Sequence, residues 1–378
     1  MAERSRGSWT RRQFVTGGIA ASGALLAGCT GAAPGGSGDD SSGESYSVTM
    51  EPVGEVTFER VPEKWVVYEP GYADMGVALG QSEGLAAVGV TSRYHTSYYD
   101  ELDGVSVAKA DLTQLYQGGV DKEVFLSLDA DVHLIDPNWL TENGAFGLDE
   151  SDVEQIADNV APFAGNTIFR RTDSWHDYEY YSLYEAFGKI AEVFQERDRY
   201  EAFKELHDDF IDDVQSDLPS SEQRPNAALV WAGEDDPEQF TPYYLSGEGT
   251  NKKQFRDLGI RDALAETEVE ARSTSESGTI DYETLLEVDP DALLIRGHEH
   301  KSREEFRDTV VAYMRDHDAG SELAAVQDDR VFRGGPIYQG PIQNLFLTER
   351  FAKLFFPDRY SGELFDRQAV ADIVAGDV

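Results

Sequence analysis

The sequence contains a single cysteine, Cys29, among 378 residues. One thiol cannot form a disulfide within the chain or build a metal centre from several cysteine ligands. The sequence also lacks the G-x-S-x-G turn of serine hydrolases, a glycine-rich phosphate-binding loop and the H-E-x-x-H pattern of zinc proteases. We therefore expect a protein without catalytic residues and without a metal ion held directly by its side chains.

Basic residues are scarce. The chain has 32 lysines and arginines, only nine of them lysine, against 72 acidic residues, which gives a net charge of -40. Such a surface repels nucleic acids and anionic membranes, so DNA or RNA binding is excluded. The composition resembles that of proteins from extreme halophiles, and an ordinary acidic extracellular protein is the alternative. A hydrophobic content of 40% is sufficient for a core, and the length allows two domains.

No hydrophobic run is long enough to span a membrane. The apolar stretch 19–27 is too short for that, but it follows "TRRQFVTGG" and ends in "LAGC" at Cys29. This order resembles a twin-arginine export signal that leads into a lipobox. We expect residues 1–28 to be a signal peptide, Cys29 to carry a lipid, and residues 29–47 to form a flexible tether. The lipid alone would hold the protein at the extracellular face of the membrane.

One pattern occurs twice. Residues 120–136 read "VDKEVFLSLDADVHLID" and residues 280–296 read "IDYETLLEVDPDALLIR". Aligned without a gap, they match at seven positions: Asp121/Asp281, Glu123/Glu283, Leu126/Leu286, Asp129/Asp289, Asp131/Asp291, Leu134/Leu294 and Ile135/Ile295. Each copy predicts a helix, a tight turn and a strand, with the first aspartate as helix cap and the glutamate exposed in the first turn. A general α/β repeat would explain the apolar matches but not the recurring glutamate.

A long helix is predicted between the two copies. In residues 197–218 apolar side chains recur at steps of three and four, and this helix would be about 33 Å long. Strands and helices alternate on both sides of it, which predicts parallel pairing with helices on both faces of each sheet. We therefore predict an α/β chain with an N-terminal lobe at 48–196, an interdomain helix at 197–218 and a C-terminal lobe at 219–378.

The order of these motifs resembles the substrate-binding proteins of ABC importers for ferric siderophores and cobalamin. The resemblance rests on the two copies, the long helix, the lipobox, "ADMGVALG", and "VQDDRVFRGG" ahead of "ERFAKLFFPDRY", and it covers roughly residues 53–358. Ala130 stands where proline is usual, which concerns a turn. The resemblance implies two Rossmann-like lobes with parallel-type sheets, joined by a single long helix, with the ligand cleft between the lobes. It further implies an ABC permease with its ATPase as partner, onto which Glu123 and Glu283 dock, and we expect a monomer.

The ligand would bind beyond the carboxyl ends of the strands. Aromatic residues and arginines follow the predicted strands, and we predict these as ligand-binding: Tyr72, Arg93, Tyr94, Trp139, Arg170, Arg171, Trp175, Trp231, Tyr243, Arg296 and Tyr338. Arginine forms directional, charge-assisted hydrogen bonds with anionic oxygens, and aromatic walls add contact area. This combination favours Fe³⁺ captured as a small-molecule chelate, a ferric siderophore, with no cofactor of the protein's own.

Other functions stay open from the sequence. Cobalamin or haem would suit the same scaffold, and the abundant tyrosines allow direct iron binding. "GHEH" at 297–300 is a weak candidate for a metal pair. A sensor module of the same fold and a secreted enzyme are the alternatives from other classes.

Overall fold

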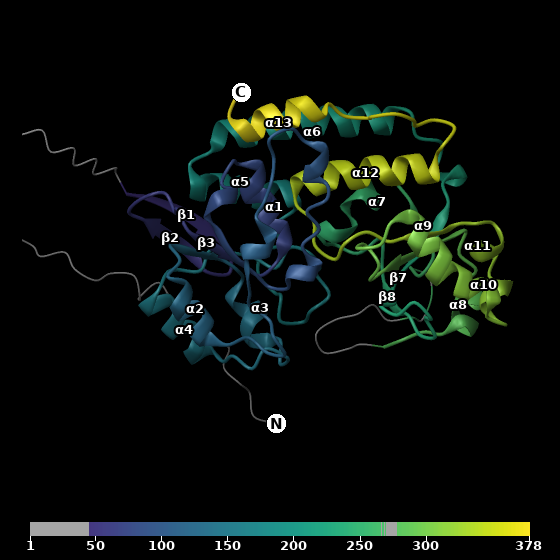
Figure 1. Cartoon of the computed structure of the whole chain (residues 1–378), viewed down its shortest axis with the longest axis horizontal. Coiled ribbons are helices and arrows are strands. Elements are labelled where there is room, and N and C mark those ends of the chain that lie inside the picture. Colours follow the sequence, from purple (N-terminus) through teal and green to yellow (C-terminus); the bar gives the residue numbers. More distant parts are fainter. Residues whose placement is uncertain (1–44, 266, 268, 270–277) are drawn as a thin grey trace, which may run out of the picture.

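The computed structural model describes residues 45–265, 267, 269 and 278–378, which form two lobes side by side (Figure 1). The predicted signal peptide, Cys29 and nearly all of the predicted tether lie outside the described residues. In the part of the chain that is described, no helix is long and apolar enough to cross a membrane.

The first lobe contains a four-stranded parallel sheet in the order β5-β4-β3-β6. An antiparallel hairpin precedes this sheet. The strands are β1 (Tyr46–Met50), β2 (Gly54–Phe58), β3 (Trp65–Val67), β4 (Leu85–Val88), β5 (Thr113–Gln114) and β6 (Val132–Leu134). The helices are α1 (Pro70–Ala78), α2 (Lys122–Leu128), α3 (Pro137–Glu142), α4 (Glu150–Asn159) and α5 (Leu183–Phe194).

The second lobe is built around a sheet in the order β11-β10-β7-β8, with β9 also paired to β7. All of these pairs are parallel except β7 with β8. The strands are β7 (Asn226–Trp231), β8 (Thr241–Tyr243), β9 (Arg261–Asp262), β10 (Ala292–Arg296) and β11 (Val331–Arg333). The helices are α7 (Lys253–Asp257), α8 (Tyr282–Val288), α9 (Arg303–Phe306), a π-helical segment (Arg307–Val311), α10 (Ala312–Asp316) and α11 (Ala324–Gln327).

Short 3₁₀ turns complete the two lobes. They lie at Ser82–Gly84, Thr91–Arg93, Tyr99–Glu101, Lys109–Asp111, Ser221–Gln223, Thr250–Lys252 and Gly320–Glu322. The prediction of an α/β fold with two lobes of parallel-type sheets is confirmed.

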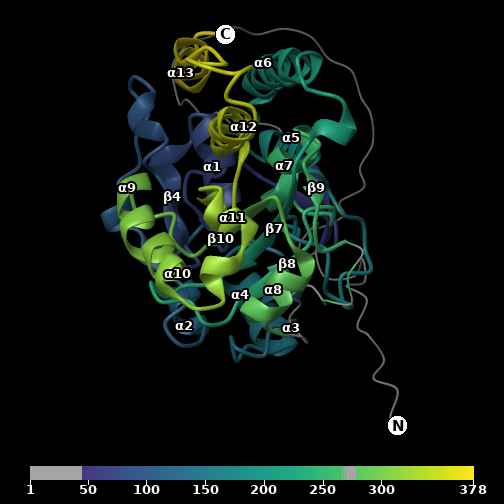
Figure 2. The same cartoon turned by 90° about the vertical axis from the view of Figure 1, so that its right-hand side faces the viewer.

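Three helices lie along the side where the lobes join. The predicted interdomain helix is α6 (Arg197–Ser216), which ends two residues earlier than predicted. Two C-terminal helices follow the second lobe, α12 (Pro341–Phe355) and α13 (Arg367–Ala375). α13 packs on α6, whereas α12 contacts α1 in one lobe and α7 in the other (Figure 2). The predicted unit 219–378 therefore includes two helices that pack against the first lobe and reinforce the connection.

The strands distribute their side chains to opposite faces, because neighbouring residues of a strand point to opposite sides. In β7, Ala227 and Leu229 join one apolar cluster, and Ala228 and Val230 join another. The first cluster also contains residues of α1, α5, α6, α12 and α13, so it is shared by both lobes. The cluster on the far face of each sheet is largely confined to one lobe. The lobes thus share one apolar cluster on the α6 side, whereas the clusters on the far faces of their sheets are largely separate.

The duplicated pattern folds as predicted, into α2 and β6 in one lobe and α8 and β10 in the other. The Asp121 carboxylate accepts a hydrogen bond from the amide of Glu123, and Asp281 accepts one from Thr284, so both aspartates cap their helices. Asp129 and Asp289 end these helices in the left-handed conformation, with φ of 48° and 46°.

The last aspartate of each copy ties two strands together. Asp131 accepts hydrogen bonds from the backbone amides of Glu63 and Lys64, just before β3, at 3.0 and 2.9 Å. Asp291 accepts one from the amide of Asn226, the first residue of β7, at 2.8 Å. In both lobes the repeated aspartate therefore fixes the start of the neighbouring parallel strand, which gives the duplication a structural reason.

Candidate functional site at the lobe junction

The two lobes touch each other where the carboxyl ends of their central strands meet. The amide of Thr250 donates a hydrogen bond to the carbonyl oxygen of Ile168 at 2.9 Å. Gly249 has φ of +136°, and a Cβ there would lie 2.3 Å from the carbonyl oxygen of Phe169, so only glycine fits this contact. We use the name lobe junction for the residues around this contact: Tyr68, Glu69, Arg93, Trp139, Phe169, Arg170, Trp231, Tyr243, Lys252, Arg296 and Tyr338.

Arg93 connects the two lobes at the junction. Its guanidinium carbon lies 5.9 Å from the centre of the Trp231 ring in the second lobe, within range of a cation–π contact. It also lies close enough to the Tyr338 hydroxyl to act on its pKa, which burial raises to about 12 against the opposing effect of Arg93. Three residues predicted from distant parts of the sequence thus meet here.

Trp139 and Arg170 form the side of the lobe junction that the first lobe contributes. The Arg170 guanidinium lies 5.3 Å from the Trp139 ring centre and 5.1 Å from that of Phe169. It makes two hydrogen bonds to the Asp173 carboxylate, at 2.8 and 3.1 Å, so its charge is already balanced. Trp175 is half-buried at 6.3 Å from Trp139. The indole Nε1 of Trp139 is buried and has no hydrogen-bond partner among the described residues.

Arg296 and Lys252 bring buried positive charge from the second lobe. Arg296 is 1% exposed, lies over Tyr243, and donates to the backbone oxygens of Asn251 and Gly334. Its Nη1 has no hydrogen-bond partner within the described ranges, and no carboxylate there forms an ion pair with it. Burial lowers its pKa to about 10. Lys252 is 2% exposed, and burial, with Arg296 and Arg256 nearby, lowers its pKa to about 7.

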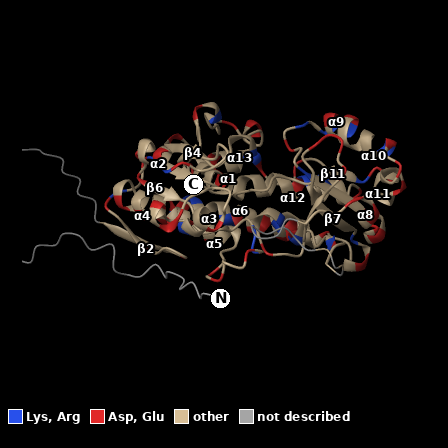
Figure 3. Ribbon diagram, turned by 90° about the horizontal axis from the view of Figure 1, so that it is seen from below, with Lys and Arg blue, Asp and Glu red and all other residues tan. Residues whose placement is uncertain are grey.

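Acidic groups at the junction do not offset this charge. Burial, and next to it the charge of Asp136, raises the pKa of the Glu69 carboxyl well above its usual range, although Arg170 acts against this. A carboxyl in this situation favours its neutral form. The junction therefore concentrates positive charge and aromatic surface. The protein as a whole is strongly acidic, and acidic residues are spread over both lobes (Figure 3).

Two of the predicted ligand-binding residues belong to the core instead. The Tyr72 hydroxyl donates to the carbonyl oxygen of Asn166 at 2.7 Å and accepts from its amide at 3.0 Å. The Tyr94 hydroxyl is bonded to that of Tyr99, which donates to Asp74. Both hydroxyls are already hydrogen-bonded within the first lobe, so the structure gives no support for ligand contact by them.

Arg171 lies at the rim of the junction. It forms an ion pair with Glu248 across the two lobes at 3.3 Å and lies over the Tyr180 ring. Lys252 was not among the predicted residues, because a lysine inside a short 3₁₀ turn carries no periodic signal. Its only mark in the sequence is the rarity of lysine in this chain.

The pair of histidines in "GHEH" does not gather further ligands. The rings of His298 and His300 are 6.4 Å apart. Across the described ranges, no group of three or more histidine, cysteine, aspartate or glutamate side chains is arranged to hold a metal ion.

Glu123 and Glu283 are exposed in the first turns of α2 and α8. Figure 1 shows both helices at the lower side of the molecule, one in each lobe, opposite α6 and α13. The two glutamates therefore occupy equivalent places on one face.

The chain matches a known protein family in sequence and known proteins in fold. Residues 66–338 match the family model described as periplasmic binding protein. The fold is similar to that of the petrobactin-binding protein YclQ from Bacillus subtilis, with a TM-score of 0.57 and 14% identity over 83% of this chain and 99% of that one. It is also similar to the catecholate-siderophore binding protein VctP from Vibrio cholerae, with a TM-score of 0.54 and 16% identity over 82% and 99% of the chains.

A third similar structure is the iron uptake ABC transporter substrate-binding protein PiuA from Streptococcus pneumoniae. Its TM-score is 0.56 at 15% identity, over 82% of this chain and 98% of that one. No match was found among curated protein sequences. Because the family model spans well over half of the chain, the protein belongs to the periplasmic binding protein family.

Proposed function

We propose that this protein is the substrate-binding component of an ABC importer and captures an anionic iron chelate, a ferric siderophore, at the lobe junction. The observation that carries the proposal is the buried Arg296, which has an unpartnered Nη1 and no carboxylate in ion-pair contact among the described residues. A buried cation without a counterion is costly, and an anionic ligand would relieve that cost.

The aromatic surroundings support a bulky, partly planar ligand. Trp231, Trp139, Tyr243 and Tyr338 surround the arginines at the junction. The similar proteins YclQ and VctP are named for petrobactin and for catecholate siderophores, and PiuA for iron uptake. The similarity to these proteins supports an iron chelate as the ligand, rather than cobalamin or haem. It also supports a binding protein rather than an enzyme.

Ligand capture would require the lobes to separate at the junction. The hydrogen bond between Thr250 and Ile168 and the ion pair between Arg171 and Glu248 would have to break. The apolar cluster shared on the α6 side would restrict this movement to a small opening, because packed cores resist continuous deformation.

The binding experiment is a fluorescence titration of the purified protein in molar KCl with ferric catecholate, ferric hydroxamate and ferric citrate chelates, cobalamin and haem. Trp231 and Trp139 lie at the junction and report on its occupancy. We expect saturable quenching by a ferric chelate. Quenching by cobalamin or haem alone would replace the ligand, and no quenching by any of these compounds would contradict the proposal.

We further propose that Glu123 and Glu283 dock onto arginines of the permease, while a lipid on Cys29 holds the monomeric protein at the extracellular face of the membrane. At molar salt the Debye length is about 3 Å, so docking would rest on close bidentate contacts. Glu123→Ala combined with Glu283→Ala should abolish uptake and leave ligand affinity unchanged. Glu205→Ala, an exposed glutamate on α6, is the control that should keep uptake. If ligand affinity falls together with uptake, the docking role is wrong.

A further inference from the structure

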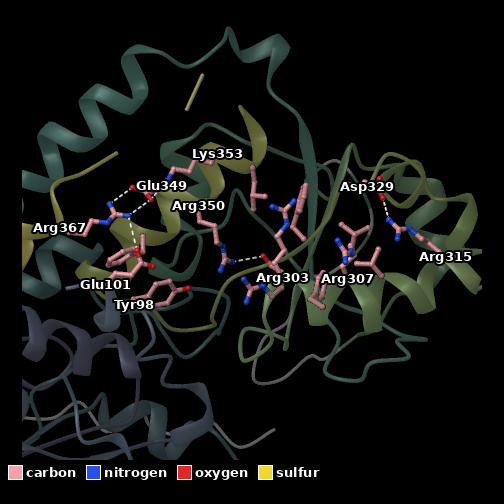
Figure 4. A pocket seen from close by; sticks show the side chains of 17 residues that line it. Tyr98, Glu101, Arg303, Arg307, Arg315, Asp329, Glu349, Arg350, Lys353 and Arg367 are labelled. Carbon is pink, nitrogen blue, oxygen red and sulfur yellow. Dashed lines mark hydrogen bonds and ion pairs between the residues drawn. The ribbon is translucent and has the colours of Figure 1, made fainter. Parts of the chain in front are cut away.

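A cavity of about 870 Å³ lies between α12 and the α9–α10 region, and none of the lobe-junction residues lines it (Figure 4). Its walls come from α9, the π-helical segment, α10, β11 and α12, and Tyr98 and Glu101 close it from the first lobe. Sites for small molecules typically have volumes of about 300–1,000 Å³. The cavity is therefore large enough for a small organic ligand.

The lining of this cavity is basic although the chain is strongly acidic. It contains six of the 23 arginines of the sequence, Arg303, Arg307, Arg315, Arg333, Arg350 and Arg367, together with Lys353. Three acidic residues accompany them, Glu101, Asp329 and Glu349. Basic side chains thus exceed acidic ones by four in a protein whose net charge is -40.

Behind the cavity lining, the Glu299 carboxylate interacts with two of the lining arginines, Arg350 and Arg333. Arg350 forms an ion pair with the buried Glu299; burial acts to raise the pKa of Glu299, but Arg350 and Arg333 outweigh it and lower it to about 2. Arg350 also donates to the carbonyl oxygen of Arg333 at 3.1 Å. The pKa of Arg333 is lowered by burial, and Arg350 and Arg303 add to this effect against Glu299. Three guanidinium groups therefore lie close enough to repel each other.

One wall of the cavity has an unusual backbone. Arg307–Val311 is π-helical, and both Arg307 and Val311 line the cavity. π-helical turns are rare and are found frequently at functional sites. Arg303 and Arg307 are exposed. Arg307 forms an ion pair with Asp308 at 3.0 Å, but this pair is exposed as well, so a ligand can reach both arginines without breaking a buried ion pair.

The cavity also lies at a second contact between the lobes. The Tyr98 hydroxyl donates to Glu299 at 3.3 Å, and the Tyr98 ring packs against Phe346 of α12 at 5.6 Å. The side chain of Gln343 donates to the carbonyl oxygen of His95 at 3.0 Å. A molecule in the cavity would therefore contact the first lobe and the second lobe together.

We infer that this cavity is a second binding site, for a small multiply charged oxyanion such as a polycarboxylate or a phosphate compound, held by Arg303, Arg307 and Arg333. Guanidinium groups bind carboxylate and phosphate oxygens in bidentate pairs, which keep part of their strength in salt because the atoms are in contact. The inference does not depend on the ligand proposed for the lobe junction.

The test is calorimetric titration of the purified protein with citrate and with pyrophosphate, in dilute and in molar KCl. We expect saturable binding of one molecule per chain, weaker at high salt. Arg303→Gln combined with Arg307→Gln should weaken it by roughly tenfold or more. The matched control is Arg197→Gln with Arg359→Gln, two exposed arginines that lie outside the cavity lining and should leave binding unchanged.

The outcomes separate the ligand sources. Binding of citrate alone would assign the site to polycarboxylates, and binding of pyrophosphate alone would assign it to phosphate compounds. Absence of saturable binding for both anions, or equal weakening in the cavity variant and its control, would overturn the inference. Unfolding midpoints equal to that of the parent protein would show that the variants are folded.

Discussion

The lobe junction and the arginine-lined cavity both concentrate positive charge, but in different ways. At the junction Arg296 and Lys252 are almost fully buried, with no ion-pair carboxylate among the described residues. In the cavity Arg350, Arg367 and Arg315 are each paired with a carboxylate. Unpaired buried charge lowers stability, whereas a carboxylate partner offsets much of the cost of burying a guanidinium group. The comparison indicates that binding of an anionic ligand would raise the free energy of unfolding more at the junction than in the cavity.

The largest effect is expected from removing positive charge at the junction. Arg93→Gln combined with Arg296→Gln should weaken binding of an anionic ferric chelate by a hundredfold or more, because each lost charged hydrogen bond is worth about 1.5–3 kcal/mol. Calorimetry measures this affinity directly. Arg303→Gln with Arg307→Gln, in the cavity, is the control and should keep chelate affinity. Equal losses of chelate affinity in both variants would show that the junction and the cavity are not separate binding sites.

Breaking an ion pair of the cavity should act on stability instead. Arg350→Met leaves Glu299 buried without its main partner, and we expect the free energy of unfolding to fall by about 2–3 kcal/mol, less than for a fully buried pair because the Arg350 side chain is 21% exposed. Denaturant unfolding at constant salt measures this. Adding Glu299→Gln removes the stranded charge and should restore part of the stability. If Arg350→Met reduces chelate affinity as strongly as it reduces stability, the junction and the cavity are not separate sites.

The junction should also respond to pH. The pKa of Lys252 is about 7 in the folded protein, because burial, Arg296, Arg256 and Arg170 lower it more than Asp262 raises it. Between pH 6 and 8 Lys252 loses its proton, so affinity for an anionic chelate should fall by up to about tenfold. Lys252→Gln should remove this dependence, and an unchanged pH profile in that variant would contradict the assignment.

The same group affects stability with the opposite sign. The ordinary pKa of lysine, 10.5, applies to the unfolded chain, so between pH 7 and 10.5 the unfolded state binds more protons than the folded state. The contribution of Lys252 to the free energy of unfolding therefore rises with pH across this window, while ligand affinity falls. Thermal unfolding as a function of pH, with Lys252→Gln as reference, tests this.

The smallest effect is expected at Tyr94, which the sequence placed in the ligand site and the structure places in the core. Tyr94→Phe removes the hydroxyl that lies 3.0 Å from that of Tyr99. The free energy of unfolding should fall by about 0.5–1.5 kcal/mol, with chelate affinity unchanged. Reduced affinity at unchanged stability would return Tyr94 to the ligand site.

Local sequence predicted the strongly periodic elements well. The helix α6 and the two copies of helix, turn and strand were found because their signals lie within a few residues: apolar spacing, a capping aspartate and a left-handed aspartate at the helix end. Helix α12, in contrast, begins at Pro341 with residues that give little periodic signal. Its first two turns are almost wholly buried, so they lack the polar stripe by which a surface helix is recognised.

Short helices and strands leave little periodic signal in the sequence. The hairpin β1–β2, the helix α3 and the helices α9 to α11 were not predicted, and most of them have only four to six residues. Such elements are stable mainly through tertiary contacts, because short isolated helices and hairpins are marginal in water. The arginines of the cavity were equally hidden, since Arg303 and Arg350 are far apart in sequence and meet only through folding.

The sequence by itself determined the α/β class, the two like lobes, the long helix between them and the acidic character of the surface. These follow from periodicity, capping and composition, which act over short distances along the chain. Only the tertiary structure decided that Tyr72 and Tyr94 serve the core, that Lys252 joins Arg296 at the junction, and that six arginines share one cavity. Burial and unpaired charge are properties of a packed environment, and residues distant in sequence supply that environment.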